Sequence, residues 1–265
     1  MGAKRIWMTA GRGGVGTGFC TVNLALALSR LGRRVLLLDG SPVCRSLDTY
    51  LSCEEDVVYD LSDLCAGRIP PAQALLAPPC GEGVMLVAGV FSAAAMPRAE
   101  EMHRALDALA DSFDEILVDA PPLPDMLACA GRFDLSCVVS DTTAASLRGA
   151  ERVGIALQEA GAREVCLLLN RFSLLHPGET AQESALAMVD RAHVRLLGII
   201  PPVGEAAFRP TPQQESALLL QAGGPHKREN ARLAFLNVAK RLTGEKALLL
   251  AGMRGIRFHR RALLY

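Results

Sequence analysis

Residues 9–20, TAGRGGVGTGFC, decide the fold. They follow a short apolar run, RIWM, and precede a helical pattern, TVNLALALSRLG. A glycine-rich turn between a strand and a helix is typical of a phosphate-binding loop, because its backbone N–H groups and the helix N-terminus attract anions. A turn without a ligand is the alternative. The glycines fit a phosphate loop, but Thr17 and Gly18 stand where such a loop carries a lysine followed by Ser or Thr.

The composition is that of one compact α/β unit. Half of the 265 residues are hydrophobic, and 28 Lys and Arg balance 28 Asp and Glu. This zero net charge argues against broad nucleic-acid binding, so we expect no sequence-specific nucleic-acid partner. No apolar run is long enough to cross a bilayer, and the start lacks the order of a signal peptide. We therefore expect a cytoplasmic protein, with peripheral binding to the inner face of the cell membrane left open.

The cysteines form no Cys-x-x-Cys pair and lie mostly in apolar or helical surroundings. This pattern predicts reduced, buried thiols in a cytosolic protein. The eight residues are Cys20, Cys44, Cys53, Cys65, Cys80, Cys129, Cys137 and Cys166.

Short apolar runs alternate with longer helical patterns along the chain. The helical patterns cover 97–113, 143–161 and 179–193 as well as the stretch after the loop. Near-continuous apolar runs are typical of strands buried on both faces of a parallel sheet. We predict a three-layer α/β/α fold with a mostly parallel sheet of about seven strands, residues 1–245 as one domain and 246–265 as a tail. The strand-type runs are RIWMTA (5–10), VLLLDG (35–40), VMLVAGV (84–90), EILVDAPP (115–122), LSCVVSD (135–141), EVCLLLN (164–170) and LLGIIPP (196–202).

Two aspartates stand at the ends of these runs. Asp39 ends the second and Asp119 ends the fourth, while the glycine-rich loop follows the first. All three features should therefore meet at the carboxyl edge of the sheet, which is where open α/β sheets bind ligands.

These segments resemble the MinD/ParA family of deviant-Walker-A ATPases, and most closely its MinD branch. The family loop reads K-G-G-x-G-K-[ST], and CRSLDTYLSCEEDVVYDLSDLCAGRIPPAQALL (44–76) is similar to the family almost position by position. TTAASLRGAERV (142–153), LLLNRF (167–172) and LLGIIPP (196–202) follow in the family's order. The resemblance spans most of residues 4–245. It implies a P-loop NTPase fold with ATP or ADP as ligand.

The resemblance also implies a nucleotide site. The family's first loop lysine, which reaches across a dimer, matches Arg12, and its second lysine, which contacts the phosphates of its own subunit, matches Thr17. The residues expected at the nucleotide are Gly11, Arg12, Gly13, Gly14, Val15, Gly16, Thr17 and Gly18 in the loop, with Asn170, Arg171, Pro201 and Pro202 where the family holds the adenine base.

The catalytic part of this site is depleted. The family's metal-binding hydroxyl matches Gly18, its paired aspartates match Asp39 and Ser41, and its Walker B aspartate matches Asp119. Phosphoryl transfer depends on a cation, a metal and a group that orients water. We therefore expect Asp39 and Asp119 to be remnants of a catalytic and magnesium site, Mg²⁺ to be a doubtful ligand, and nucleotide to bind weakly or not at all.

Three functions remain open. The first is a pseudo-ATPase scaffold in division-site or protein positioning, which leaves the status of the chain as an enzyme uncertain. The second is an active, dimerising, membrane-associated ATPase, and the third is a localisation factor for pilus or surface-polymer assembly. A homodimer, a MinD-type heteropartner and a division-regulator protein are the partners that the resemblance implies.

Two surfaces carry further predictions. The pattern SLRGAERVGIALQ holds Ser146, Arg148 and Glu151 where the family has its dimer and partner surface, although an ordinary solvated helix face fits equally. Residues 246–265 mix apolar side chains with arginines, which is typical either of a membrane-surface segment or of a basic tail packed on a protein.

Overall fold

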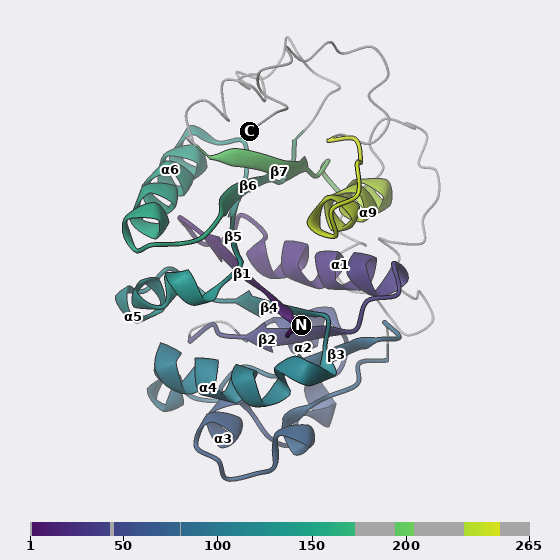
Figure 1. Cartoon of the computed structure of the whole chain (residues 1–265), viewed down its shortest axis with the longest axis vertical. Coiled ribbons are helices and arrows are strands. Elements are labelled where there is room, and N and C mark those ends of the chain that lie inside the picture. Colours follow the sequence, from purple (N-terminus) through teal and green to yellow (C-terminus); the bar gives the residue numbers. More distant parts are fainter. Residues whose placement is uncertain (1, 43–44, 80, 173–193, 204–230, 250–265) are drawn as a thin grey trace.

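The computed structural model describes residues 2–42, 45–79, 81–172, 194–203 and 231–249, which form a sheet between two layers of helices (Figure 1). The strands are β1 (Lys4–Ala10), β2 (Val35–Asp39), β3 (Val84–Val87), β4 (Glu115–Asp119), β5 (Leu135–Ser140), β6 (Val165–Leu169) and β7 (Arg195–Ile199). The α-helices are α1 (Thr17–Arg30), α2 (Leu47–Tyr50), α3 (Leu61–Cys65), α4 (Ala99–Leu109), α5 (Pro124–Ala128), α6 (Ala144–Glu159) and α9 (Ala231–Leu242). Short 3₁₀ turns are η1 (Glu54–Asp56), η2 (Pro71–Ala74), η3 (Ala93–Ala95), η4 (Ala110–Ser112) and η5 (Ala130–Arg132).

The seven strands pair in the order β3-β2-β4-β1-β5-β6-β7, and all six pairings are parallel. Every residue of β2, β5 and β6 is buried, as expected of strands that helices cover on both faces. The predicted fold class and all seven predicted strands are therefore confirmed.

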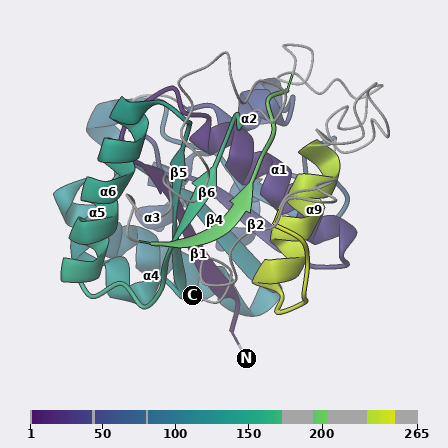
Figure 2. The ribbon, with the colours of Figure 1, turned by 90° about the horizontal axis from the view of Figure 1, so that it is seen from above.

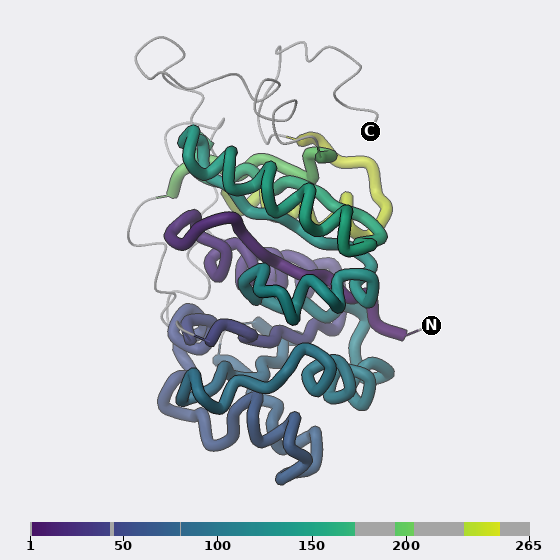
Figure 3. Tube along the Cα trace, turned by 90° about the vertical axis from the view of Figure 1, so that its left-hand side faces the viewer, coloured from purple at the N-terminus to yellow at the C-terminus, as the bar shows by residue number. Residues whose placement is uncertain are grey.

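Each face of the sheet has its own apolar core. Helices α3, α4, α5 and α6 cover one face and α1, α2 and α9 the other, so the sheet lies between the two layers (Figure 2). Figure 3 faces the first layer, in which α6, α5 and α4 lie one below another. Because β1 is central, both the loop after it and the helix α1 are anchored in the middle of the molecule.

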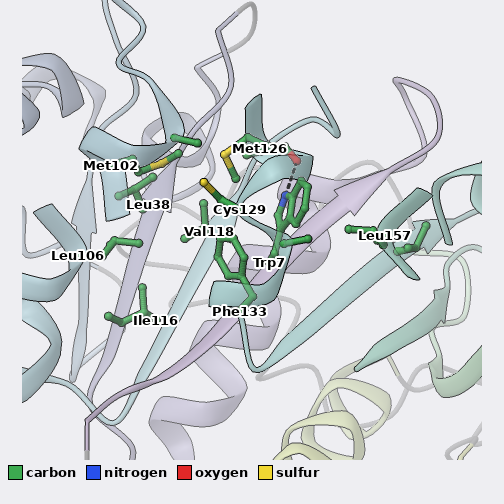
Figure 4. Close-up of a cluster of buried hydrophobic side chains, with 14 of the residues drawn as sticks. Trp7, Leu38, Met102, Leu106, Ile116, Val118, Met126, Cys129, Phe133 and Leu157 are labelled. Carbon is green, nitrogen blue, oxygen red and sulfur yellow. Dashed lines mark hydrogen bonds between the residues drawn. The ribbon is translucent and has the colours of Figure 1, made fainter. Parts of the chain in front are cut away.

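Trp7 illustrates how tightly β1 is held. Its indole is fully buried, and Nε1 donates to the carbonyl oxygen of Ala120, 2.9 Å away (Figure 4). Phe133 packs against its ring with the centroids 5.5 Å apart, and Cys129 lies in the same cluster. This core fixes β1 relative to the segment that follows β4, so it also positions the ends of both strands.

The remaining predictions about elements have mixed outcomes. The pattern over 97–113 forms α4 and η4, and the pattern over 143–161 forms α6. The helix predicted at 179–193 lies outside the described residues, as does most of the predicted tail, from 250 to 265. Within the described ranges, no helix has the length and apolarity that crossing a membrane requires.

The cysteines that the structure describes carry free thiols. Five of these six are buried, as predicted, whereas Cys65 is only half-buried. Cys44 and Cys80 lie outside the described residues.

Candidate functional site

The glycine-rich loop connects Ala10, the last residue of β1, to Thr17, the first residue of α1. Gly14 and Gly16 have φ angles of 82° and 90°, in the left-handed region that a side chain disfavours. Gly16 caps α1 without a side-chain hydrogen bond, and the first turn carries no acidic residue. The backbone therefore has the local form of an anion-binding loop, with the positive end of a long helix left free for an anion.

Helix α6 lies directly on this loop. A Cβ atom added at Gly11 would lie 2.2 Å from the carbonyl carbon of Gly149, and a Cβ at Gly149 would lie 3.1 Å from the oxygen of Gly11. The two backbones touch with no side chain between them. Only glycine at position 11 allows this approach, so the loop and α6 pack as one unit.

The two residues that directly follow β6, Asn170 and Arg171, also hold the loop by hydrogen bonds. The Asn170 amide Nδ2 donates to the carbonyl oxygen of Val15 at 2.8 Å, and Arg171 Nη1 donates to that of Gly14 at 2.9 Å. Asn170 is buried, whereas Arg171 is exposed and has a φ angle of 56°. Both predicted base-pocket residues thus contact the loop, and the guanidinium of Arg171 brings a positive charge to it.

The second half of the predicted base pocket lies beside the first. Ile200 donates its N–H to Leu169 and accepts one from Phe172, so the turn at Pro201 and Pro202 runs next to the end of β6. Pro201 is buried and Pro202 is exposed. Contact of these residues with a nucleotide remains a prediction.

Three other residues lie close to Gly18. A Cβ at this position would lie 3.1 Å from Ser46 Oγ, 3.2 Å from Asp119 Oδ2 and 3.3 Å from Tyr50 Cε2. These contacts are tighter than ordinary van der Waals distances, so a side chain at position 18 would require its neighbours to shift by a few tenths of an ångström. Ser46 and Tyr50 come from the segment after β2, and the sequence did not indicate them.

Asp39 anchors that segment. Its side chain is 1% exposed, and its carboxylate accepts backbone N–H groups from Ser41 (3.1 Å), Ser46 (2.9 Å) and Leu47 (3.1 Å). Burial raises the pKa of Asp39, and these hydrogen bonds oppose that effect. Asp39, predicted as a catalytic remnant, thus stabilises the segment after β2 in a position next to α1.

Asp119 lies directly across from Asp39 in the pairing of β2 and β4, as predicted from the strand ends. It is partly buried, and burial together with the charge of Asp39 raises its pKa to about 8. In the described part of the chain, no hydrogen bond to its carboxylate is found. Within the described ranges, Asp119 is therefore a carboxyl group without a hydrogen-bond donor.

The donor set at this edge suits a hard divalent cation only in part. The described residues hold no group of three or more His, Cys, Asp or Glu side chains placed to bind a metal. Magnesium, however, usually takes one or two carboxylates and completes its shell with phosphate oxygens and water. Asp119 fits the carboxylate role, and Ser46 brings a hydroxyl oxygen to the same point.

Arg12 is an exposed residue of the loop. Its side chain is exposed, and its Nε donates to the carbonyl oxygen of Gly13 at 3.3 Å. With Arg171, it gives the loop two cationic side chains in place of the missing lysine.

The predicted surface on α6 is only partly exposed. Arg148 faces solvent and Glu151 is half-buried, but Ser146, in the first turn of the helix, is buried. Ser146 therefore does not belong to that surface. Arg152 and Ile155 are exposed one and two turns after Arg148 and extend it.

Comparisons with known proteins agree with the fold. No protein-family model matches the chain. The septum site-determining protein MinD of Bacillus subtilis is 28% identical over 254 residues, which cover 93% of this chain and 91% of that protein. The MinC:MinD cell division complex of Aquifex aeolicus contains a chain that is 28% identical, with a TM-score of 0.80 and coverage of 93% and 98%. MinD of Pyrococcus horikoshii, solved with Mg-ADP, has the same fold at 23% identity, with a TM-score of 0.73 and coverage of 91% and 96%.

Proposed function

The chain is a homologue of MinD proteins with the fold of the MinD and ParA-family ATPases, and we propose that it is a positioning protein that binds adenine nucleotide without hydrolysing it. The observation that carries this proposal is the packing at Gly18. A Cβ at this position would come within 3.1 Å of Ser46 and 3.3 Å of Tyr50, so the surroundings fit closely around a residue that has no side chain and no hydroxyl.

Three losses in one site act against hydrolysis. Thr17 brings no positive charge to the phosphates, Gly18 brings no metal ligand, and Ser41 brings no carboxylate to orient water. Removal of one preorganised stabilising group typically slows turnover by roughly 10²–10³-fold. Such losses are not additive, but three together leave hydrolysis negligible.

Nucleotide binding is supported by what the site retains. The loop keeps its glycines, α1 keeps a free positive end, and Asn170 and Arg171 hold the loop in shape. Arg171 and Arg12 supply positive charge next to the loop backbone, although neither replaces a lysine inside the loop. The affinity for adenine nucleotide should therefore be lower than that of a complete phosphate loop, and Mg²⁺ should increase it less than it does for such a loop.

The partners follow from the same homology. MinD of Aquifex aeolicus is solved in complex with MinC, a cell division protein. We propose a division-type regulator as the partner, with the exposed side of α6 around Arg148, Arg152 and Ile155 as its contact. A homodimer in which Arg12 reaches the second subunit, and peripheral membrane contact through residues 246–265, belong to the same proposal.

Substitution of lysine for Thr17 tests the proposal by calorimetric titration with ADP. We expect the natural chain to bind ADP weakly, and Thr17→Lys to bind it roughly 10–100-fold more tightly, the effect of one charge-assisted hydrogen bond. The single change is preferable to one that also restores threonine at Gly18, because a side chain there would press on Ser46, Asp119 and Tyr50, which would have to shift.

A matched control tests whether ADP affinity depends on where the positive charge is placed or only on the added charge. Ala66→Lys adds the same charge at an exposed site after α3 and should leave the affinity unchanged. If neither the natural chain nor Thr17→Lys binds ADP, the chain is a protein-interaction scaffold without nucleotide. If the natural chain binds ADP and lysine at Thr17 has no effect, the loop does not hold the phosphates.

A further inference from the structure

Ser46 occupies the N-cap position of α2 but does not cap the helix. A serine at this position normally accepts a hydrogen bond from the first turn, yet here its side chain makes no such bond. Its Oγ lies instead next to Gly18, 3.1 Å from where a Cβ of that residue would be. Among the described residues, Ser46 Oγ has no hydrogen-bond partner. The hydroxyl therefore points toward the start of α1 and makes no hydrogen bond to any part of the chain that the structure describes.

Asp39 holds Ser46 in this place. The backbone N–H of Ser46 donates to the buried Asp39 carboxylate at 2.9 Å, and the next residue, Leu47, donates to the same oxygen at 3.1 Å. Leu47 is itself fully buried in the core beneath α1. The position of the hydroxyl thus depends on a buried anchor and does not rest on a loosely placed surface loop.

The carboxylate of Asp119 lies near the same position beside Gly18. Its Oδ2 lies 3.2 Å from the Cβ position of Gly18, so the carboxylate and the Ser46 hydroxyl approach that position together. A carboxylate and a hydroxyl, with phosphate oxygens and water, make up the oxygen ligand set that Mg²⁺ prefers. The carboxylate has no donor of its own in the described part of the protein.

We propose that Ser46 replaces the loop hydroxyl missing at Gly18 and is a direct ligand of the Mg²⁺ that accompanies a bound nucleotide. This inference rests on the proposed function, because the metal would arrive with the nucleotide. Asp119 is the carboxylate of the same set, and Asp39 is a positioning residue that acts through Ser46. The segment after β2 thereby restores a metal ligand, but neither the positive charge missing at Thr17 nor the carboxylate missing at Ser41, so the site still lacks two of the groups that hydrolysis needs.

Thr17 is the competing source of a hydroxyl, because it opens α1 at the loop. The two residues make different predictions. If Thr17 were the ligand, its removal would weaken the effect of the metal and removal of Ser46 would not.

The test measures how much Mg²⁺ tightens ADP binding, by calorimetry in Mg²⁺ and in EDTA, which requires no turnover. We expect Mg²⁺ to tighten ADP binding by the natural chain, and Ser46→Ala to reduce that factor by about tenfold, the order found when groups around a bound metal are removed. The affinity in EDTA should stay within about twofold, since Ser46 then has no metal to ligate. Thr17→Ala should keep the metal effect, and so should Thr49→Ala, a matched control at an exposed position on α2.

A second readout is the electron paramagnetic resonance of Mn²⁺ in place of Mg²⁺ with ADP, where Ser46→Ala should release the protein-bound ion. If Ser46→Ala keeps the full metal effect, or Thr17→Ala loses it, Ser46 is not the ligand. ADP binding by the natural chain without any metal effect would also overturn the role of Ser46, but would leave the proposed function intact. Absence of ADP binding under both conditions would overturn both.

Discussion

Alanine in place of Gly11 is expected to lower the free energy of unfolding by about 3 kcal/mol or more, the upper end of what overpacking costs. The added Cβ would lie 2.2 Å from the carbonyl carbon of Gly149 and 2.3 Å from its oxygen. Both are backbone atoms in the first half of α6, so no side chain can rotate away to make room. Either α6 or the loop must shift as a whole.

Gly13 provides a matched control in the same loop. A Cβ there meets no atom within 4 Å, and Gly13 is not among the glycines with a positive φ angle. Gly13→Ala should therefore change stability by no more than about 0.5 kcal/mol. Denaturant unfolding of both variants measures the difference. Equal stability of the two would mean that α6 and the loop are not in backbone contact.

The second large effect is a dependence of stability on pH that comes from Asp119. Its pKa is about 8 in the folded chain and returns to the ordinary value of an aspartate on unfolding. The folded state therefore binds the proton more tightly, and the stability that this gives is complete at low pH and falls as the pH rises from about 4 to about 8. For a partly buried group, we expect a loss on the order of 3 kcal/mol across that range.

Asp119→Asn removes the titrating group while keeping its shape. In EDTA, so that no metal contributes, this variant should be more stable than the natural chain at pH 8.5 by about 2–3 kcal/mol, and the two should converge toward pH 4. Asp111→Asn, at an exposed position in η4, should keep the pH profile of the natural chain. Parallel profiles for the natural chain and Asp119→Asn would show that Asp119 is not the group responsible.

Much of the fold was predictable because it depends on local patterns. The near-continuous apolar runs identified the seven strands, and the glycine-rich turn identified the connection to α1. The positions of Asp39 and Asp119 at the same edge followed from strand ends alone, since parallel strands end on one side. These features do not require knowledge of which distant residues touch.

The contacts that shape the site were not predictable in this way. Ser46 reaches Gly18 only because Asp39 draws the intervening chain inward through three backbone hydrogen bonds. The close approach of Gly149 to Gly11 depends on how α6 packs on β1 and β5, for which no sequence spacing gives a signal. Even the N-cap position of Ser46 would have suggested a helix cap, which is not what its hydroxyl does.

The central claim is that the site binds nucleotide but no longer hydrolyses it, and its most direct test is release of phosphate from Mg-ATP by the purified chain, measured alongside ATP binding in the same preparation. We predict bound ATP with no phosphate released above the background without protein. Steady Mg²⁺-dependent phosphate release that disappears in Asp119→Ala would contradict the claim and identify the chain as an active ATPase.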